Sequence, residues 1–127
     1  MKQFLVFGLV LVLLTACGKQ APAYTDNGNP GQIKATVFYD DNKNGVMDSG
    51  ESGVPQTPGA ISQEISCPPS SYPNWVNTDL TGVIIFKDLK PGKYCVSVNS
   101  PFSTSKASQE VYVSSDTITA ITFGISR

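Results

Sequence analysis

The sequence predicts an all-β protein in which short strands pack as a β-sandwich. From residue 33 onward, hydrophobic and polar residues alternate over short runs, which is the period of strands that bury one face. Turns rich in Pro, Gly, Asn and Asp separate these runs. No window of the sequence carries the apolar stripe of an amphipathic helix, so helical folds are disfavoured.

The first predicted strand covers residues 33–39. Its hydrophobic residues occupy alternate positions and therefore share the face that we expect to be buried. These residues are Ile33, Ala35, Val37 and Tyr39. A polar loop follows this strand directly.

The remaining predicted strands are short and are bounded by turn residues. They cover residues 59–66, 82–86, 93–99, 109–113 and 117–125. The last two form a pair that is joined near residues 114–116, and residues 89–92 form a turn. Residues 67–79 are predicted as a long loop, since they contain three prolines.

The loop after the first strand has the spacing of a twelve-residue calcium loop. Calcium takes about six to eight oxygen ligands, and Gly45 stands at the sixth position, where the loop turns sharply. The expected ligands, in loop order, are Asp40, Asn42, Asn44, the backbone carbonyl of Val46, Asp48 and Glu51. A plain polar turn is the alternative, because Asp, Asn and Gly form turns anyway. We favour calcium, because a random loop rarely fills every ligand position.

The flanking sequence excludes an ordinary EF-hand. A helix should lead into and out of such a loop, whereas here a predicted strand leads in and Ser52-Gly53-Val54-Pro55 leads out. A dockerin would need helices and a second copy of the loop. The loop is therefore predicted to be a structural calcium site within a β domain.

The first sixteen residues read as a bacterial lipoprotein signal peptide. Lys2 supplies a positive start, an apolar run follows, and Leu14-Thr15-Ala16-Cys17 matches a lipobox. The apolar run is too short to span a bilayer of about 30 Å as a helix. Cleavage would leave Cys17 as a lipid-bearing first residue, on the outer side of a bacterial membrane. An ordinary secretory peptide with an incidental cysteine is the alternative.

Three segments are expected: residues 1–16 as signal peptide, 17–31 as lipidated cysteine and flexible tether, and 32–127 as one domain. The net charge is −1 and basic residues are not clustered, so we expect no nucleic-acid partner and predict a monomer. The sequence contains no histidine, which removes Ser-His-Asp and Cys-His centres and most zinc sites. We therefore expect no enzymatic activity.

Two cysteines remain beside Cys17. Cys67 and Cys95 would form one disulfide in an oxidising compartment, and two free thiols are the alternative. Cys95 alternates with Tyr94 and Val96 and therefore faces away from them. A bridge thus requires that Cys67 has left its strand, which Pro68 and the proline after it would favour.

Three segments of the sequence carry a family resemblance. They are residues 37–54, residues 78–82 running into residues 86–94, and the closing Thr122-Phe123-Gly124-Ile125. The chain resembles the calcium-binding B repeats of bacterial SD-repeat surface adhesins, a branch of the transthyretin-like, Cna-B-like sandwiches. The resemblance implies a prealbumin-like sandwich of about seven strands, stiffened by calcium at the loop residues named above. Cna-B relatives cross-link a Lys to an Asn of the last strand, but residues 123–126 contain no Asn to pair with Lys34.

Two functions follow as expectations. The first is a non-enzymatic surface lipoprotein whose calcium-stabilised domain serves as a structural or adhesion module. The second is a module that binds carbohydrate or protein through a loop carrying Tyr72 and Trp75, because exposed aromatic residues are common binding anchors. The alternative for that loop is that the Trp75 side chain folds back and caps the sandwich.

Overall fold

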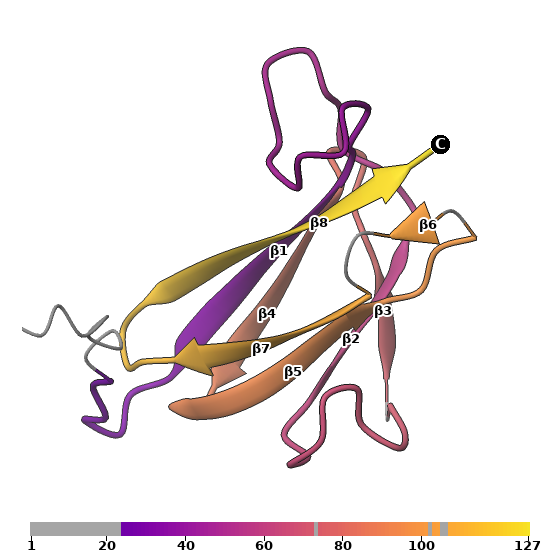
Figure 1. Cartoon of the computed structure of the whole chain (residues 1–127). Helices are drawn as coiled ribbons and strands as arrows, with labels where there is room; N and C mark the ends of the chain where they lie inside the picture. The colour runs from indigo at the N-terminus through magenta and orange to yellow at the C-terminus, as the bar shows by residue number, and fades with distance from the viewer. Residues whose placement is uncertain (1–23, 73, 102, 105–106) are drawn as a thin grey trace, which may run out of the picture.

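The computed structural model describes residues 24–72, 74–101, 103–104 and 107–127. They form a β-sandwich of two four-stranded sheets, as predicted (Figure 1). No helix is present among these residues, so none of them belongs to a helix able to cross a membrane.

The sheets are built from eight strands, one of which has only two residues. In chain order they are β1 (Gly31–Tyr39), β2 (Pro58–Ser62), β3 (Trp75–Asn77), β4 (Val83–Leu89), β5 (Gly92–Val98), β6 (Ser103–Thr104), β7 (Ser108–Val113) and β8 (Ile118–Ser126).

The first sheet has the order β4-β1-β8-β6 and the second the order β3-β2-β5-β7. All pairings are antiparallel except that of β1 with β8, which runs parallel from Gln32↔Ile118 to Tyr39↔Ile125. The strands β7 and β8 follow each other in the chain but lie in different sheets. The predicted final pair is therefore not a hairpin. Val113 of β7 and Phe123 of β8 contribute to the same core from opposite sheets.

The core lies between the sheets, as the strand periodicity predicts. Ile33, Ala35 and Val37 of β1 are fully buried, and Tyr39 packs at the edge of the core. Phe38 is also fully buried, on the opposite face of β1, where an isolated bridge joins it to Gly53.

The largest differences from the prediction concern the second strand, the long loop and the fourth strand. The second strand ends at Ser62, because the chain turns away there into the segment of residues 63–72. The predicted long loop contains β3, whose Trp75 pairs with Ala60. The fourth strand continues to Leu89, since Gly31 pairs with that residue.

Candidate calcium loop and disulfide-bound segment

The candidate calcium loop, residues 40–51, projects from the end of β1 (Figure 1, upper part). Its base is closed by backbone hydrogen bonds between the strand and the returning chain. Tyr39 N–H donates to the Ser52 carbonyl at 2.9 Å, and Val54 N–H donates to the Val37 carbonyl at 2.8 Å. The loop therefore begins and ends at one fixed point of the sandwich.

Asp40 joins the loop to the first sheet. Its backbone N–H donates to the Ile125 carbonyl of β8 at 2.9 Å, and the residue is only 1% exposed. Its carboxylate accepts the backbone N–H groups of Asn44 at 3.1 Å and of Gly45 at 2.9 Å. The ion pairs of the described residues, Lys93–Glu110 and Arg127–Asp41, do not include it. A buried carboxylate of this kind would gain from a cation, since desolvation is costly for an unpaired charge.

Asp48 collects the side-chain amides of the loop. The Nδ2 groups of Asn42 and Asn44 both donate to Asp48 Oδ2, at 2.7 Å and 2.6 Å. These bonds, led by that of Asn42, hold the pKa of Asp48 below its usual value.

Glu51 holds the two halves of the loop together. Its Oε1 accepts the N–H of Asp41 at 3.0 Å and its Oε2 accepts that of Asp48 at 2.9 Å. Val46 is exposed, and its N–H donates to Asn44 Oδ1 at 2.8 Å. All six expected ligands therefore belong to one loop that is tied by its own hydrogen bonds.

The donor set fits calcium in its chemistry. It consists of carboxylate, amide and carbonyl oxygens, which are the ligands that this hard cation prefers. In the described part of the chain, no group of three or more His, Cys, Asp or Glu side chains is arranged to hold a metal. In this structure the carboxylates accept N–H groups instead, and calcium binding at the loop remains a prediction.

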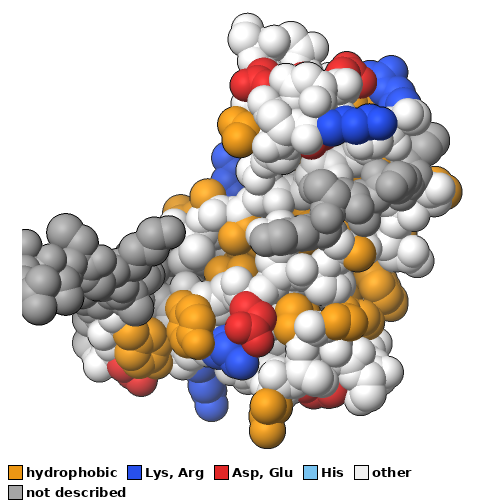
Figure 2. Space-filling model, viewed as in Figure 1, with side chains coloured by type: hydrophobic (Ala, Val, Ile, Leu, Met, Phe, Trp, Pro, Cys, Tyr) orange, Lys and Arg blue, Asp and Glu red, His pale blue; other side chains and the backbone are white. Residues whose placement is uncertain are grey.

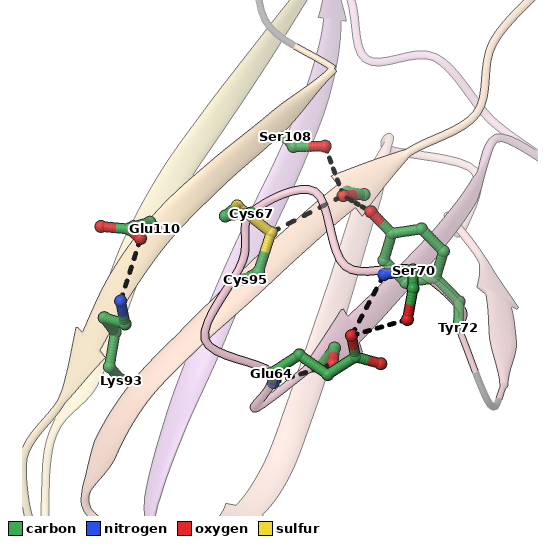
Figure 3. Close-up of a disulfide and its surroundings, with 10 residues drawn as sticks. Glu64, Cys67, Ser70, Tyr72, Lys93, Cys95, Ser108 and Glu110 are labelled. Carbon is green, nitrogen blue, oxygen red and sulfur yellow. Dashed lines mark hydrogen bonds and ion pairs between the residues drawn. A yellow bond between two sulfur atoms is a disulfide. The ribbon is translucent and has the colours of Figure 1, made fainter.

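The second feature is a disulfide between Cys67 and Cys95, as predicted (Figure 3). Cys67 lies beyond the end of β2, which satisfies the requirement that it leave the strand. Cys95 lies on β5 and is 1% exposed. The bridge fixes the segment of residues 63–72 over the outer face of the second sheet.

Polar contacts complete this attachment (Figure 3). The Tyr72 hydroxyl hydrogen-bonds with Ser97 Oγ, which also shares a hydrogen bond of 2.6 Å with Ser108 Oγ. Within the segment, Glu64 Oε2 accepts the N–H of Ser70 at 3.1 Å and its hydroxyl at 3.0 Å. Because the segment covers it, β5 is buried on both faces from Tyr94 to Val98.

The two candidate binding residues form an aromatic pair at the edge of the second sheet. The ring centroids of Tyr72 and Trp75 are 5.0 Å apart with an interplanar angle of 54°. Trp75 is 46% exposed, so it belongs neither to a free loop nor to a closed cap. The signal segment 1–16 and the lipidation residue Cys17 lie outside the described residues.

Comparison with known proteins places this fold in a family. The sequence model of the SdrD B-like domain matches residues 31–122, from β1 into β8. The chain belongs to the SdrD B-like domain family. This agrees with the adhesin B-repeat resemblance of its three sequence segments.

Relatives of this SdrD B-like domain are found in larger proteins. Colossin-B of Dictyostelium discoideum is 36% identical over 72 residues, which cover 50% of this chain. The chain spans only 2% of the length of that protein.

Two solved structures share the fold at low sequence identity. GBS52, the minor pilin of Streptococcus agalactiae, superposes with a TM-score of 0.56 at 14% identity, over 78% of this chain and 45% of its own. The Bacillus anthracis TIE protein superposes with a TM-score of 0.57 at 16% identity, over 78% of this chain and 18% of its own. The B-type sandwich is thus a unit that also occurs within longer chains.

Proposed function

We propose that this domain is a non-enzymatic, calcium-stabilised structural module of an adhesin-type surface protein, held at a bacterial membrane by lipid on Cys17. The observation that carries the proposal is the buried Asp40 carboxylate at the base of an oxygen-rich loop. Family membership supports a structural role for the sandwich around it.

Calcium would act on stability through this junction. An ion that binds only the native state adds RT ln(1 + [Ca]/Kd), or about 2.7 kcal/mol at a hundredfold excess over Kd. The loop returns to the sheet through Ser52 and Val54, so holding its shape also holds the end of β1. Residues 40–51 would then act as a rigid corner.

The experiment is a thermal melt with calcium and with excess chelator. For a domain of this size, 2.7 kcal/mol corresponds to a rise of roughly 10–20 °C in Tm. Asp40→Ala should abolish the difference, whereas Asp88→Ala, an exposed change on β4, should leave it intact. An identical melt in chelator and in calcium would refute calcium stabilisation, and calorimetric titration would measure the affinity directly.

The aromatic pair supports a second candidate function. Trp75 is half-exposed and lies against Tyr72, whose segment is fixed by the Cys67–Cys95 bridge. A rigid, exposed aromatic pair can stack on a sugar ring or anchor a protein ligand at low entropic cost. Screening against glycans and surface proteins tests this, with Trp75→Ala as the variant that should lose binding.

A further inference from the structure

The first described residues are bound to one end of the sandwich. Ser115 N–H donates to the Thr25 carbonyl at 2.9 Å, and Asn27 N–H donates to Ser115 Oγ at 3.0 Å. The side-chain amides of Asn27 and Asn29 both donate to Asp116 Oδ2, at 2.8 Å and 3.1 Å. Residues 24–30 are therefore attached to the connection between β7 and β8.

We name this region the entry end, defined as residues 24–30, Tyr112 and residues 114–118. The strand β1 starts there, since Gln32 N–H donates to the Thr117 carbonyl at 2.9 Å. The candidate calcium loop starts where β1 finishes, nine residues later, or about 30 Å away at ~3.3 Å per residue. Figure 1 shows the two regions at opposite ends of the first sheet.

The proposed lipid anchor is close to the entry end along the chain. Cys17 precedes Tyr24 by seven residues, which span at most about 25 Å when fully extended. Because residues 25–29 are bound to the sandwich, the attachment holds the domain by its entry end. A lipid on Cys17 therefore keeps this end near the bilayer.

The side chains exposed at the entry end suit a lipid interface. Tyr24 is 49% exposed, Tyr112 59% and Ile118 65%. The hydroxyl of Thr119 donates to the Tyr112 carbonyl at 3.3 Å, which joins the start of β8 to β7. Tyr112 and Ile118 therefore flank this end from the outer faces of the two sheets. Hydrophobic side chains lie exposed at this end of the molecule in Figure 2 (lower left). Tyrosine is favoured at the boundary between headgroups and water, because one end of its ring is apolar and the other polar.

The opposite end of the domain carries the candidate calcium loop, where Val46 is 59% and Met47 40% exposed. Its acidic residues outnumber its basic ones, with Asp40, Asp41, Asp48 and Glu51 against Lys43 and Arg127. Figure 2 shows both acidic and basic side chains at the upper end.

We propose that the entry end is a membrane-facing surface, in which Tyr24, Tyr112 and Ile118 contact the lipid headgroup region. The candidate calcium loop then points away from the bilayer. Asp26 and Asp116 lie at the same end and Lys93 is paired with Glu110, so the contact is interfacial rather than electrostatic. This inference rests on the proposed lipid anchor, and the test supplies that anchor chemically.

The test measures tryptophan depth in the lipid-linked domain. The chain from Cys17 onward is coupled through that cysteine to a phospholipid and bound to zwitterionic vesicles that contain brominated lipid. Cys17 is the free thiol for coupling, since Cys67 and Cys95 form the disulfide. In a Trp75→Phe background, Ile118→Trp places a reporter at the entry end. Leu80→Trp, at an 86% exposed position before β4, is the matched reporter away from it.

The expected result is a loss of emission for the reporter at residue 118 and almost none for that at residue 80. Tyr112→Ser combined with Tyr24→Ser should reduce the loss at residue 118 while leaving Tm unchanged, because both side chains are exposed. Equal quenching at both positions, or none at residue 118, would overturn the membrane-facing surface. Intact-mass measurement of the protein from bacterial cells tests lipidation of Cys17 separately, so the two failures are distinguishable.

Discussion

Asp40 packs directly on Gly124. A Cβ at Gly124 would lie 2.7 Å from Asp40 Oδ2 and 2.9 Å from Asp40 Cβ, closer than real side chains approach. The position of Asp40, the first residue of the candidate calcium loop, therefore depends on the absence of a side chain at Gly124 of the last strand. The closing Phe123-Gly124-Ile125 and the loop, which are far apart in sequence, form one structural unit.

Gly124→Ala should destabilise the domain by about 1–3 kcal/mol, because the added methyl group overpacks against Asp40. It should also weaken calcium binding, since Asp40 has to move. Chemical denaturation and calorimetric titration measure the two effects. Thr122→Ala, an exposed change on the same strand, should stay within about 0.5 kcal/mol of the parent. A Gly124→Ala variant with parental stability and affinity would contradict this contact.

Acid should release residues 24–30 from the sandwich. Hydrogen bonds from Asn27 and then Asn29 hold the pKa of Asp116 below its ordinary value. A carboxyl whose pKa is depressed in the folded protein stabilises that protein at pH values above the ordinary Asp pKa of about 3.9. This contribution is lost as the pH falls through the lower pKa of the folded state. The protection factors of the Asn27 and Ser115 amides, which correct for the intrinsic pH dependence of exchange, should therefore fall in that acidic window.

Asp116→Asn should remove this pH dependence, because the residue that titrates is gone. Asp41→Asn serves as the control, since Asp41 is exposed and lies beyond the opposite end of β1 from the attachment. The prediction fails if the protection factors in the Asp116→Asn protein still fall at acid pH as they do in the parent.

Loss of the disulfide should lower the free energy of unfolding. The bridge closes a separation of 28 residues, which corresponds to about 3–4 kcal/mol in the chain-entropy model. Denaturation of the Cys67→Ala/Cys95→Ala protein measures this loss, and Cys17→Ala should leave the unfolding free energy unchanged. If the double variant were as stable as its parent, the bridge would have no stabilising role.

Iodide should quench the fluorescence of Trp75, because its side chain is 46% exposed. Tyr72→Ala should increase the quenching, since the Tyr72 ring lies 5.0 Å away and shields one side of the indole. The protein has one tryptophan, so the signal needs no assignment. If iodide does not quench the emission, the Trp75 side chain is shielded from solvent. That outcome would argue against the candidate binding function.

The sequence predicted those parts of the fold in which one face of a strand is buried and the other is exposed to solvent. The first strand is of this kind, and its alternation identified Ile33, Ala35 and Val37 correctly. The fifth strand is different, because the disulfide-bound segment buries its outer face as well. Its pattern shows only that Cys95 points away from the core, and not that a cover lies there. The cover depends on a contact over 28 residues, which local pattern does not encode.

Edge elements were the least predictable. The strand β3 has three residues, all exposed, and follows a proline-rich segment, so no hydrophobic alternation marks it. The separation of β7 and β8 into different sheets was missed as well, because adjacent strands usually pair. For the candidate loop, ligand spacing identified the residues in sequence. The contact of Asp40 with Gly124 was not predicted, because it depends on the parallel pairing of β1 with β8.

That parallel pairing also has a mechanical consequence. From Gln32↔Ile118 to Tyr39↔Ile125, β1 and β8 run side by side in the same direction. The described chain enters β1 at one end of the sandwich and leaves β8 at the other. Tension applied between these two points would pull the strands past each other in shear. Their hydrogen bonds would share the load and would have to break together, which is the geometry of a link that resists extension.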